Sequence, residues 1–251
     1  MIIAVLNQKG GVGKTTTVIN LASYLAKTGK RVIVVDADPQ GNATSGLGID
    51  KNSIPLTLYD GLVHKKPADD VLTATIFDNV TVMPANSNLA GAEIELSQEF
   101  GREAVLKNLL DGLIADYILI DCPPSLGLLT VNALCAADSV LIPVQTEYYA
   151  LEGISQLLQV VQKVQQAINP RLSIVGVLMT MVDPRTSLSK QVHEELKKHF
   201  GDLLFHASIP RNVRLAEAPS HGVPISEYDK WSKGARAYKA LTKELIARTG
   251  I

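Results

Sequence analysis

The sequence predicts an α/β fold: one domain over residues 1–251, with a mostly parallel, twisted sheet and helices on both of its faces. Short β-branched, apolar runs alternate along the chain with longer stretches of helical periodicity. These runs are continuously apolar, as in strands that are buried on both faces. The chain has 251 residues, 46% of them hydrophobic, which is enough for one sizeable core.

Six apolar runs are expected to form the sheet. They are residues 2–6, 31–35, 80–83, 117–120, 140–144 and 174–179. The strongest helical patterns cover residues 14–27, 102–114, 151–167, 187–200 and 233–248. Residues 41–78 are rich in Gly, Asn, Asp and Pro, so this segment is predicted to form loops and short helices rather than sheet.

Several function classes do not fit this composition. None of the apolar runs approaches the ~20 residues that a membrane-spanning helix needs. The first six residues lead directly into a glycine-rich loop and lack the features of a signal peptide, so we expect a cytoplasmic protein. Cys122 and Cys135 lack metal-type spacing and are expected to be reduced, buried thiols.

Charge is distributed unevenly along the chain. The net charge of −1 does not suggest a generally basic nucleic-acid binder. Residues 1–170 contain 11 Lys and Arg against 17 Asp and Glu, whereas residues 171–251 contain 13 against 8. The basic C-terminal third is either a binding surface or an ordinary solvated surface, and charge alone does not decide between them.

A glycine-rich loop follows the first predicted strand and precedes the first predicted helix. The loop expected to bind ATP consists of Lys9, Gly10, Gly11, Val12, Gly13, Lys14, Thr15 and Thr16. Its glycines allow the backbone N–H groups to approach phosphate oxygens, and the helix N-terminus adds a positive end. Lys14 is expected to reach the β- and γ-phosphates and Thr15 to bind Mg²⁺.

The loop departs from the ordinary Walker pattern at one position. Gln8 stands where G-x-x-x-x-G-K-[ST] requires glycine, and a second lysine, Lys9, precedes the double glycine. This is the deviant Walker signature. A lysine at the start of the loop has little room to fold back on its own phosphates, so Lys9 is expected to serve a nucleotide on a facing subunit.

Two predicted strands end in carboxylates. Asp36 and Asp38 follow the strand at residues 31–35, and Asp121 follows the strand at 117–120. The carboxyl ends of parallel strands lie at the ligand-binding edge of a sheet, so all three acids should face the phosphate loop. Aspartates are also common in ordinary turns, so a purely structural role is the alternative interpretation of each of these three residues. Pro123 and Pro124 stiffen the segment after Asp121.

The whole chain resembles the ParA/MinD family of deviant Walker ATPases, most closely its ParA/Soj-type DNA-partitioning branch. The strings that carry the resemblance are NQKGGVGKTTT, DADPQGNATSGLG, EYYALEG and IPRNVRLAEAPS. The resemblance implies a SIMIBI-like, deviant P-loop NTPase fold that uses ATP and Mg²⁺. It implies that Lys9 crosses a nucleotide-sandwich homodimer, that Asp38 positions the attacking water, and that Asp36 and Asp121 lie in the Mg²⁺ shell.

The same resemblance extends to partners. It implies that Pro210 and Asn212 lie near the adenine and that Arg185 and Arg214 bind double-stranded DNA without sequence preference. It further implies a ParB-type centromere-binding partner, a nucleoid-associated location and no membrane binding. The string at residues 147–153 is expected at the dimer face, although its two tyrosines, Tyr148 and Tyr149, fit a plain core role equally well.

Four other kinds of protein share parts of this sequence pattern and are alternative interpretations. A MinD-like membrane ATPase ranks second, but residues 239–248 hold few bulky apolar side chains for an amphipathic anchor. A nitrogenase-type iron protein would need exposed cluster cysteines. A small-molecule ligase such as a dethiobiotin synthetase lacks the partition strings. A positioner of other cargo uses the same ATPase chemistry, and the sequence does not identify cargo.

Overall fold

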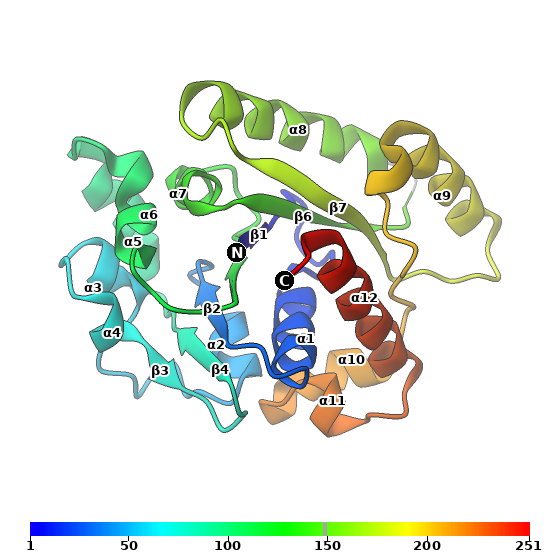
Figure 1. Cartoon of the computed structure of the whole chain (residues 1–251), viewed down its shortest axis with the longest axis horizontal. Helices are drawn as coiled ribbons and strands as arrows, with labels where there is room; N and C mark the ends of the chain where they lie inside the picture. Colours follow the sequence, from blue (N-terminus) through cyan, green and yellow to red (C-terminus); the bar gives the residue numbers. More distant parts are fainter. Residues whose placement is uncertain (148–149) are drawn as a thin grey trace.

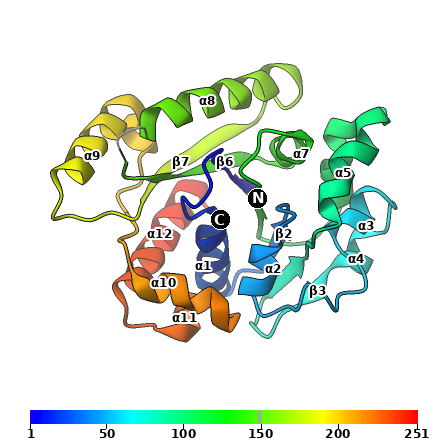
Figure 2. The same ribbon diagram turned by 180° about the vertical axis from the view of Figure 1, so that it is seen from behind.

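The structure is a computed structural model that describes residues 1–147 and 150–251, with the side chains of residues 150–152 left out. Its centre is a seven-stranded sheet in the order β3-β4-β2-β5-β1-β6-β7 (Figures 1 and 2). The strands are β1 Ile2–Val5, β2 Val32–Asp36, β3 Thr73–Ala74, β4 Val80–Met83, β5 Tyr117–Asp121, β6 Ser139–Gln145 and β7 Ser173–Thr180. All pairings are parallel except that of β3 with β4. The predicted α/β fold is confirmed.

Helices cover both faces of this sheet (Figure 1). On one side lie α3 Leu58–Leu62, α4 Ala68–Val71, α5 Leu89–Glu95, α6 Val105–Leu110, α7 Leu128–Ala136 and α8 Ala150–Ala167. On the other lie α1 Lys14–Ala26, α2 Asn42–Gly46, α10 Val213–Glu217, α11 Ile225–Tyr228 and α12 Lys233–Thr249. Helix α9, Ser187–Phe200, follows β7 at one end of the sheet (Figure 1).

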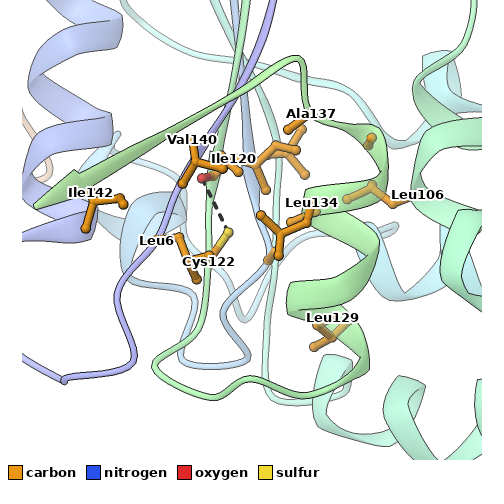
Figure 3. Close-up of a cluster of buried hydrophobic side chains, with 14 of the residues drawn as sticks. Leu6, Leu106, Ile120, Cys122, Leu129, Leu134, Ala137, Val140 and Ile142 are labelled. Carbon is orange, nitrogen blue, oxygen red and sulfur yellow. Dashed lines mark hydrogen bonds between the residues drawn. The ribbon is translucent and has the colours of Figure 1, made fainter. Parts of the chain in front are cut away.

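Apart from the edge strand β3, each strand contributes to two separate cores because its side chains alternate between faces. In β1, Ala4 packs in the core beneath α7 and α8, whereas Ile3 and Val5 pack beneath α1 and α12. Burial on both sides is the physical reason for the continuously apolar runs. Figure 3 shows part of the first core, where Cys122 lies among apolar side chains between the sheet and α7. Both cysteines are free and buried, as predicted.

The structure corrects three sequence-based expectations. The helix predicted over residues 102–114 is a short 3-10 turn, Arg102–Ala104, followed by α6, which ends at Leu110, and Gly112 then takes a left-handed φ of +83°. Residues 41–78 were predicted to lack sheet, but they contain the two-residue edge strand β3. Helices α5, α7, α10 and α11 were not among the predicted helices, because three of them are short and α7 is apolar on all sides.

The described residues include no helix that is long and apolar enough to cross a bilayer.

Gly176 on β7 provides a test of the second core. A Cβ atom at this position would lie 2.3 Å from Cε2 of the rigid Phe205 ring. We therefore expect Gly176→Ala to lower the free energy of unfolding by about 1–3 kcal/mol through overpacking, measured by urea denaturation. The double variant Gly176→Ala/Phe205→Leu should recover part of this loss. If the double variant is less stable by the sum of the two single effects, the ring clash is not the cause.

Candidate active site

The phosphate loop joins β1 to α1 at the carboxyl edge of the sheet (Figure 2). Gly11 and Gly13 have φ of +74° and +90°, a conformation that a side chain would strain. Gly13 is also the N-cap of α1, which is 13 residues long and directs its free N–H groups toward the loop. Gly10 has open space where a Cβ would be. The loop is thus exposed, positively polarised backbone of the kind that binds phosphate.

Lys14 lies at the centre of the site. Only 7% of the residue is exposed, and its Nζ donates a hydrogen bond to the Lys9 carbonyl at 3.2 Å. Burial lowers the pKa of Lys14, while the nearby Asp121, Cys122 and Asp38 side chains raise it by a smaller amount. A buried ammonium held by one carbonyl is a favourable partner for a phosphate.

The register of the sheet brings the carboxylates together. Asp36 on β2 pairs directly with Asp121 on β5, and the Ala37 N–H donates to the Asp121 carbonyl at 2.9 Å. Asp36 and Asp121 are fully buried and Asp38 is 9% exposed. The structure therefore places all three predicted acids and Lys14 in one cluster beside the phosphate loop.

The two strand-end carboxylates differ in their partners. Oδ2 of Asp36 accepts hydrogen bonds from the Thr44 N–H at 2.8 Å and the Thr44 hydroxyl at 2.7 Å. Neither buried oxygen of Asp121 has a well-formed hydrogen bond, although the Thr15 hydroxyl is close enough to lower its pKa. Burial and the Asp36 charge nevertheless hold the pKa of Asp121 well above its usual range. Asp121 is therefore better placed than Asp36 to accept a bond from a bound ion's water shell.

Mg²⁺ fits this site through few protein ligands. No group of three or more His, Cys, Asp and Glu side chains converges into a metal cage within the described part of the chain. Mg²⁺ does not require one, because it keeps several waters and binds through one or two protein oxygens and the substrate phosphates. The open oxygens of Asp121 and the hydroxyl of Thr15 match that requirement.

The predicted base-binding segment lies beside the phosphate loop. Thr180, the last residue of β7, donates its hydroxyl to the Val12 carbonyl at 2.8 Å. Two residues farther on, Val182 forms a parallel bridge with Pro210. Oδ1 of Asn212 is buried with no hydrogen-bond partner. An orphaned buried acceptor is costly on its own, so this oxygen suits a ligand N–H such as an adenine amino group.

The predicted dimer-forming residues are partly described. Lys9 is exposed and forms an ion pair with Glu147 of the same chain. Gln8 Nε2 donates to the Gly153 carbonyl at 2.9 Å, which joins the start of the loop to α8. Tyr148 and Tyr149 lie outside the described residues. In this isolated chain Lys9 is thus turned toward a carboxylate beside the loop.

Arg185 and Arg214 lie in neighbouring segments. Arg185 makes a bidentate contact with Asp183, at 2.9 and 2.8 Å, and its side chain is 87% exposed. Arg214 contacts Glu217 at 2.9 Å and Asp229 at 3.7 Å. Because Val182 pairs with Pro210, both arginines follow the same bridge within four residues.

Sequence reasoning missed several residues that shape the site. Thr44 fixes Asp36, Thr180 holds the phosphate loop, and Asn7 Nδ2 donates to the Pro143 carbonyl at 2.7 Å while its Oδ1 accepts from the Lys9 N–H. Glu93 of α5 accepts a hydrogen bond from the Leu129 N–H at 3.2 Å, in the first turn of α7. Thr44 and Asn7 lie inside the partition strings. Thr180 and Glu93 carry no local signal.

The chain is similar in sequence to a known protein family and, over nearly its whole length, to individual proteins. A family model described as an AAA domain matches residues 1–174. The sporulation initiation inhibitor protein Soj of Bacillus subtilis is 58% identical over 248 residues, which cover 98% of both chains. The chromosome partitioning protein ParA of Caulobacter vibrioides is 49% identical over 251 residues, which cover 98% of this chain and 94% of the relative.

A solved structure is similar in fold. The cobyrinic acid a,c-diamide synthase from Mycobacterium smegmatis, with bound ADP and magnesium, superposes with a TM-score of 0.87 and is 38% identical. The match covers 99% of this chain and 95% of that one. Its name denotes a different chemistry on the same architecture, so the fold alone does not assign an activity.

Asp36 gives the site a testable pH dependence. Burial is the main reason that its pKa rises from 3.8 to about 6. Between these values the folded protein keeps a proton that the unfolded chain has released, so the stability due to Asp36 falls as pH rises. Without metal or nucleotide, Asp36→Asn should therefore gain about 1–3 kcal/mol of stability relative to the parent between about pH 4 and pH 7.

Urea unfolding between about pH 2 and about pH 7 would measure the effect, and Asp183→Asn is the matched control. The Arg185 guanidinium lowers the pKa of Asp183 to about 2, so stability from Asp183 is lost as pH falls below about 4. The control should therefore change in the opposite direction and at lower pH. A stability difference between Asp36→Asn and the parent that does not vary with pH would contradict the burial argument.

Proposed function

The chain belongs to the Soj and ParA family of chromosome-partitioning ATPases, and we propose that it couples ATP hydrolysis to reversible, non-specific binding of double-stranded DNA. The ATPase activity and the need for ATP and Mg²⁺ follow from the family and from related structures with nucleotide and magnesium. That the chain binds DNA, forms a dimer and responds to a partner protein is what we propose.

The chain's own residues have separate tasks in hydrolysis. Thr15 and Asp121 would hold Mg²⁺, which would supply positive charge to neutralise the phosphates. The loop N–H groups hold the phosphates, and Lys14 exchanges the Lys9 carbonyl for a phosphate oxygen. Asp121 orients the water shell of the ion, while Asp38 positions the attacking water. Asp38 is held for this role by the Gln40 N–H, which donates to its Oδ1 at 2.9 Å.

Two copies of the chain are proposed to close face to face around the nucleotides. Lys9 then leaves Glu147 and neutralises charge on the phosphates of the facing subunit. The pair is about half exposed, so water screens it and it is weak enough to exchange. A second cation at the transferred phosphoryl group is the kind of contact worth ~10³–10⁵ in rate in other phosphoryl-transfer enzymes.

One observation carries the link between nucleotide and DNA. The Val182–Pro210 bridge lies two residues after Thr180, which contacts the phosphate loop. Arg185 follows Val182 in the chain, whereas Asn212 and Arg214 both follow Pro210. The residues proposed to contact the base and those proposed to contact DNA thus all lie close in sequence to the same Val182–Pro210 bridge. A ParB-type partner would stimulate hydrolysis, open the dimer and release DNA, so that DNA bound to that partner follows the ATPase over the nucleoid.

Co-sedimentation with duplex DNA in ATP, in ADP and without nucleotide would test this function. We expect DNA binding with ATP and Mg²⁺ only. If the ATP-loaded protein binds no DNA at low salt but binds anionic vesicles, the partition proposal fails and a MinD-like function replaces it.

Asp38→Ala separates binding from chemistry. The variant keeps the phosphate loop, Lys14 and Asp121, so it should bind ATP and dimerise, yet hydrolyse ATP about 10²-fold or more slowly because no carboxylate positions the water. Single-turnover hydrolysis and size-exclusion chromatography would measure the two properties. Hydrolysis at the parent rate would assign the water-positioning role to another residue.

Arg185→Glu and Arg214→Glu separate DNA binding from dimerisation. Each arginine lies outside the nucleotide motifs, so ATP-dependent dimers should persist while DNA affinity falls. The slope of log affinity against log salt should become shallower by about 1 for each DNA phosphate that the variant no longer neutralises. Lys107→Glu on α6, an exposed charge reversal on the other face of the sheet, is the control and should leave both properties unchanged. Loss of dimerisation in the arginine variants would contradict the separation.

A further inference from the structure

The only tryptophan of the chain, Trp231, lies outside both cores. Its exposed fraction is 79%, and it precedes α12 in the basic C-terminal third. An indole has a large apolar area that is normally buried in a core or at an interface, and here most of that area is in water. Its exposure is therefore a feature that folding of the single chain does not explain.

Trp231 belongs to the same polar network as Arg214. The backbone N–H of Trp231 donates to Oδ1 of Asp229 at 3.1 Å, and Oδ2 of Asp229 lies 3.7 Å from Nε of Arg214. Nζ of Lys230 lies 5.5 Å from the indole centroid, within the range of a cation–π contact. Lys230 thus lies beside the indole, and Asp229 links the Trp231 backbone to Arg214.

The backbone next to Trp231 is held by the N-terminus of α12. The Ser232 hydroxyl caps α12 by accepting from the Ala235 N–H at 3.0 Å. The first turn of α12 then packs tightly on α10, because a Cβ at Gly234 would lie 2.7 Å from Cγ of Leu215. Helices α10 and α12 lie together in both views of the fold (Figures 1 and 2). The segment that presents Arg214 and the segment that presents Trp231 are therefore one unit.

The side chains around Trp231 suit a ligand that carries many negative charges and also has apolar faces. The segments around Trp231 and Arg214 carry five exposed cations: Arg211, Arg214, Lys230, Lys233 and Arg236. The acids Glu217 and Asp229 are occupied by Arg214. We propose that Trp231 contacts DNA directly, its indole lying against sugar or base edges while the surrounding cations hold the adjacent phosphates. This inference rests on the proposed DNA binding and adds an aromatic contact to it.

Fluorescence of the single tryptophan reports on this contact without any added label. In ATP-loaded protein, acrylamide should quench Trp231 efficiently because the indole is exposed. Duplex DNA should protect it from acrylamide and change its emission, with the same midpoint as binding of a labelled duplex measured by anisotropy. ATP-loaded protein without DNA is the reference state, so that dimerisation is accounted for.

Variants separate the aromatic contact from the charges. Trp231→Ala should weaken DNA affinity about 5- to 30-fold and leave the salt slope unchanged, because an indole releases no counterions. Trp231→Phe should restore affinity to within about 3-fold of the parent, since it keeps an aromatic face. Phe100→Ala removes another fully exposed aromatic, between α5 and α6, and should have no effect. Basal ATP hydrolysis should be unchanged in all three variants.

The outcomes distinguish this inference from the function on which it rests. If labelled DNA binds with parent affinity to Trp231→Ala and leaves Trp231 equally quenched in the parent, the inference is overturned while the proposed DNA binding stands. If anionic vesicles protect Trp231 and DNA does not, the indole is a membrane contact and the inference is also overturned. If the ATP-loaded parent binds no DNA at all, the proposed function itself fails.

Discussion

The site depends on two carboxylates that the sheet forces together. The parallel pairing of β2 with β5 sets Asp36 opposite Asp121, both without exposure to water. Burial raises the pKa of both carboxyl groups, and the charge of Asp36 raises that of Asp121 further, so the ionised pair destabilises the folded chain. Lys14 is the nearby cation and is itself desolvated. A cationic ligand therefore has most to gain here, and the cluster accounts for the metal dependence of the site.

The sequence predicted the parts of the site that are local. A strand, a glycine turn and a helix occur in one continuous stretch, so the phosphate loop and Lys14 could be placed from residue order alone. Strand ends located Asp36 and Asp121, because parallel strands share a carboxyl edge. The contacts of Thr180 and Glu93 were not predictable in this way. Each joins segments more than 30 residues apart, and a lone Thr or Glu has no periodic signal.

The fold was predictable to a similar depth. All six predicted strands were found because their buried faces require long apolar runs, whereas β3 is a two-residue edge strand with one exposed residue. The helix predicted over residues 102–114 was too long for a related reason. Its periodicity continues past Leu110, but Asp111 takes an extended backbone conformation and ends the helix, and Gly112 then takes a left-handed one. Backbone conformation at single residues such as these cannot be read from hydrophobic spacing.

The ion pair between Lys9 and Glu147 is compatible with the proposed exchange of Lys9 between its own chain and a facing one. Both side chains are about half exposed, so the pair contributes at most about 1 kcal/mol and is easily replaced. In the isolated chain the pair keeps a flexible lysine at the mouth of the loop, where Gln8 also ties the loop to α8. A phosphate carries more charge than a carboxylate and offers more acceptor oxygens. In the proposed dimer, a nucleotide on the facing chain would therefore compete well for Lys9, and its occupancy would favour association of the two chains.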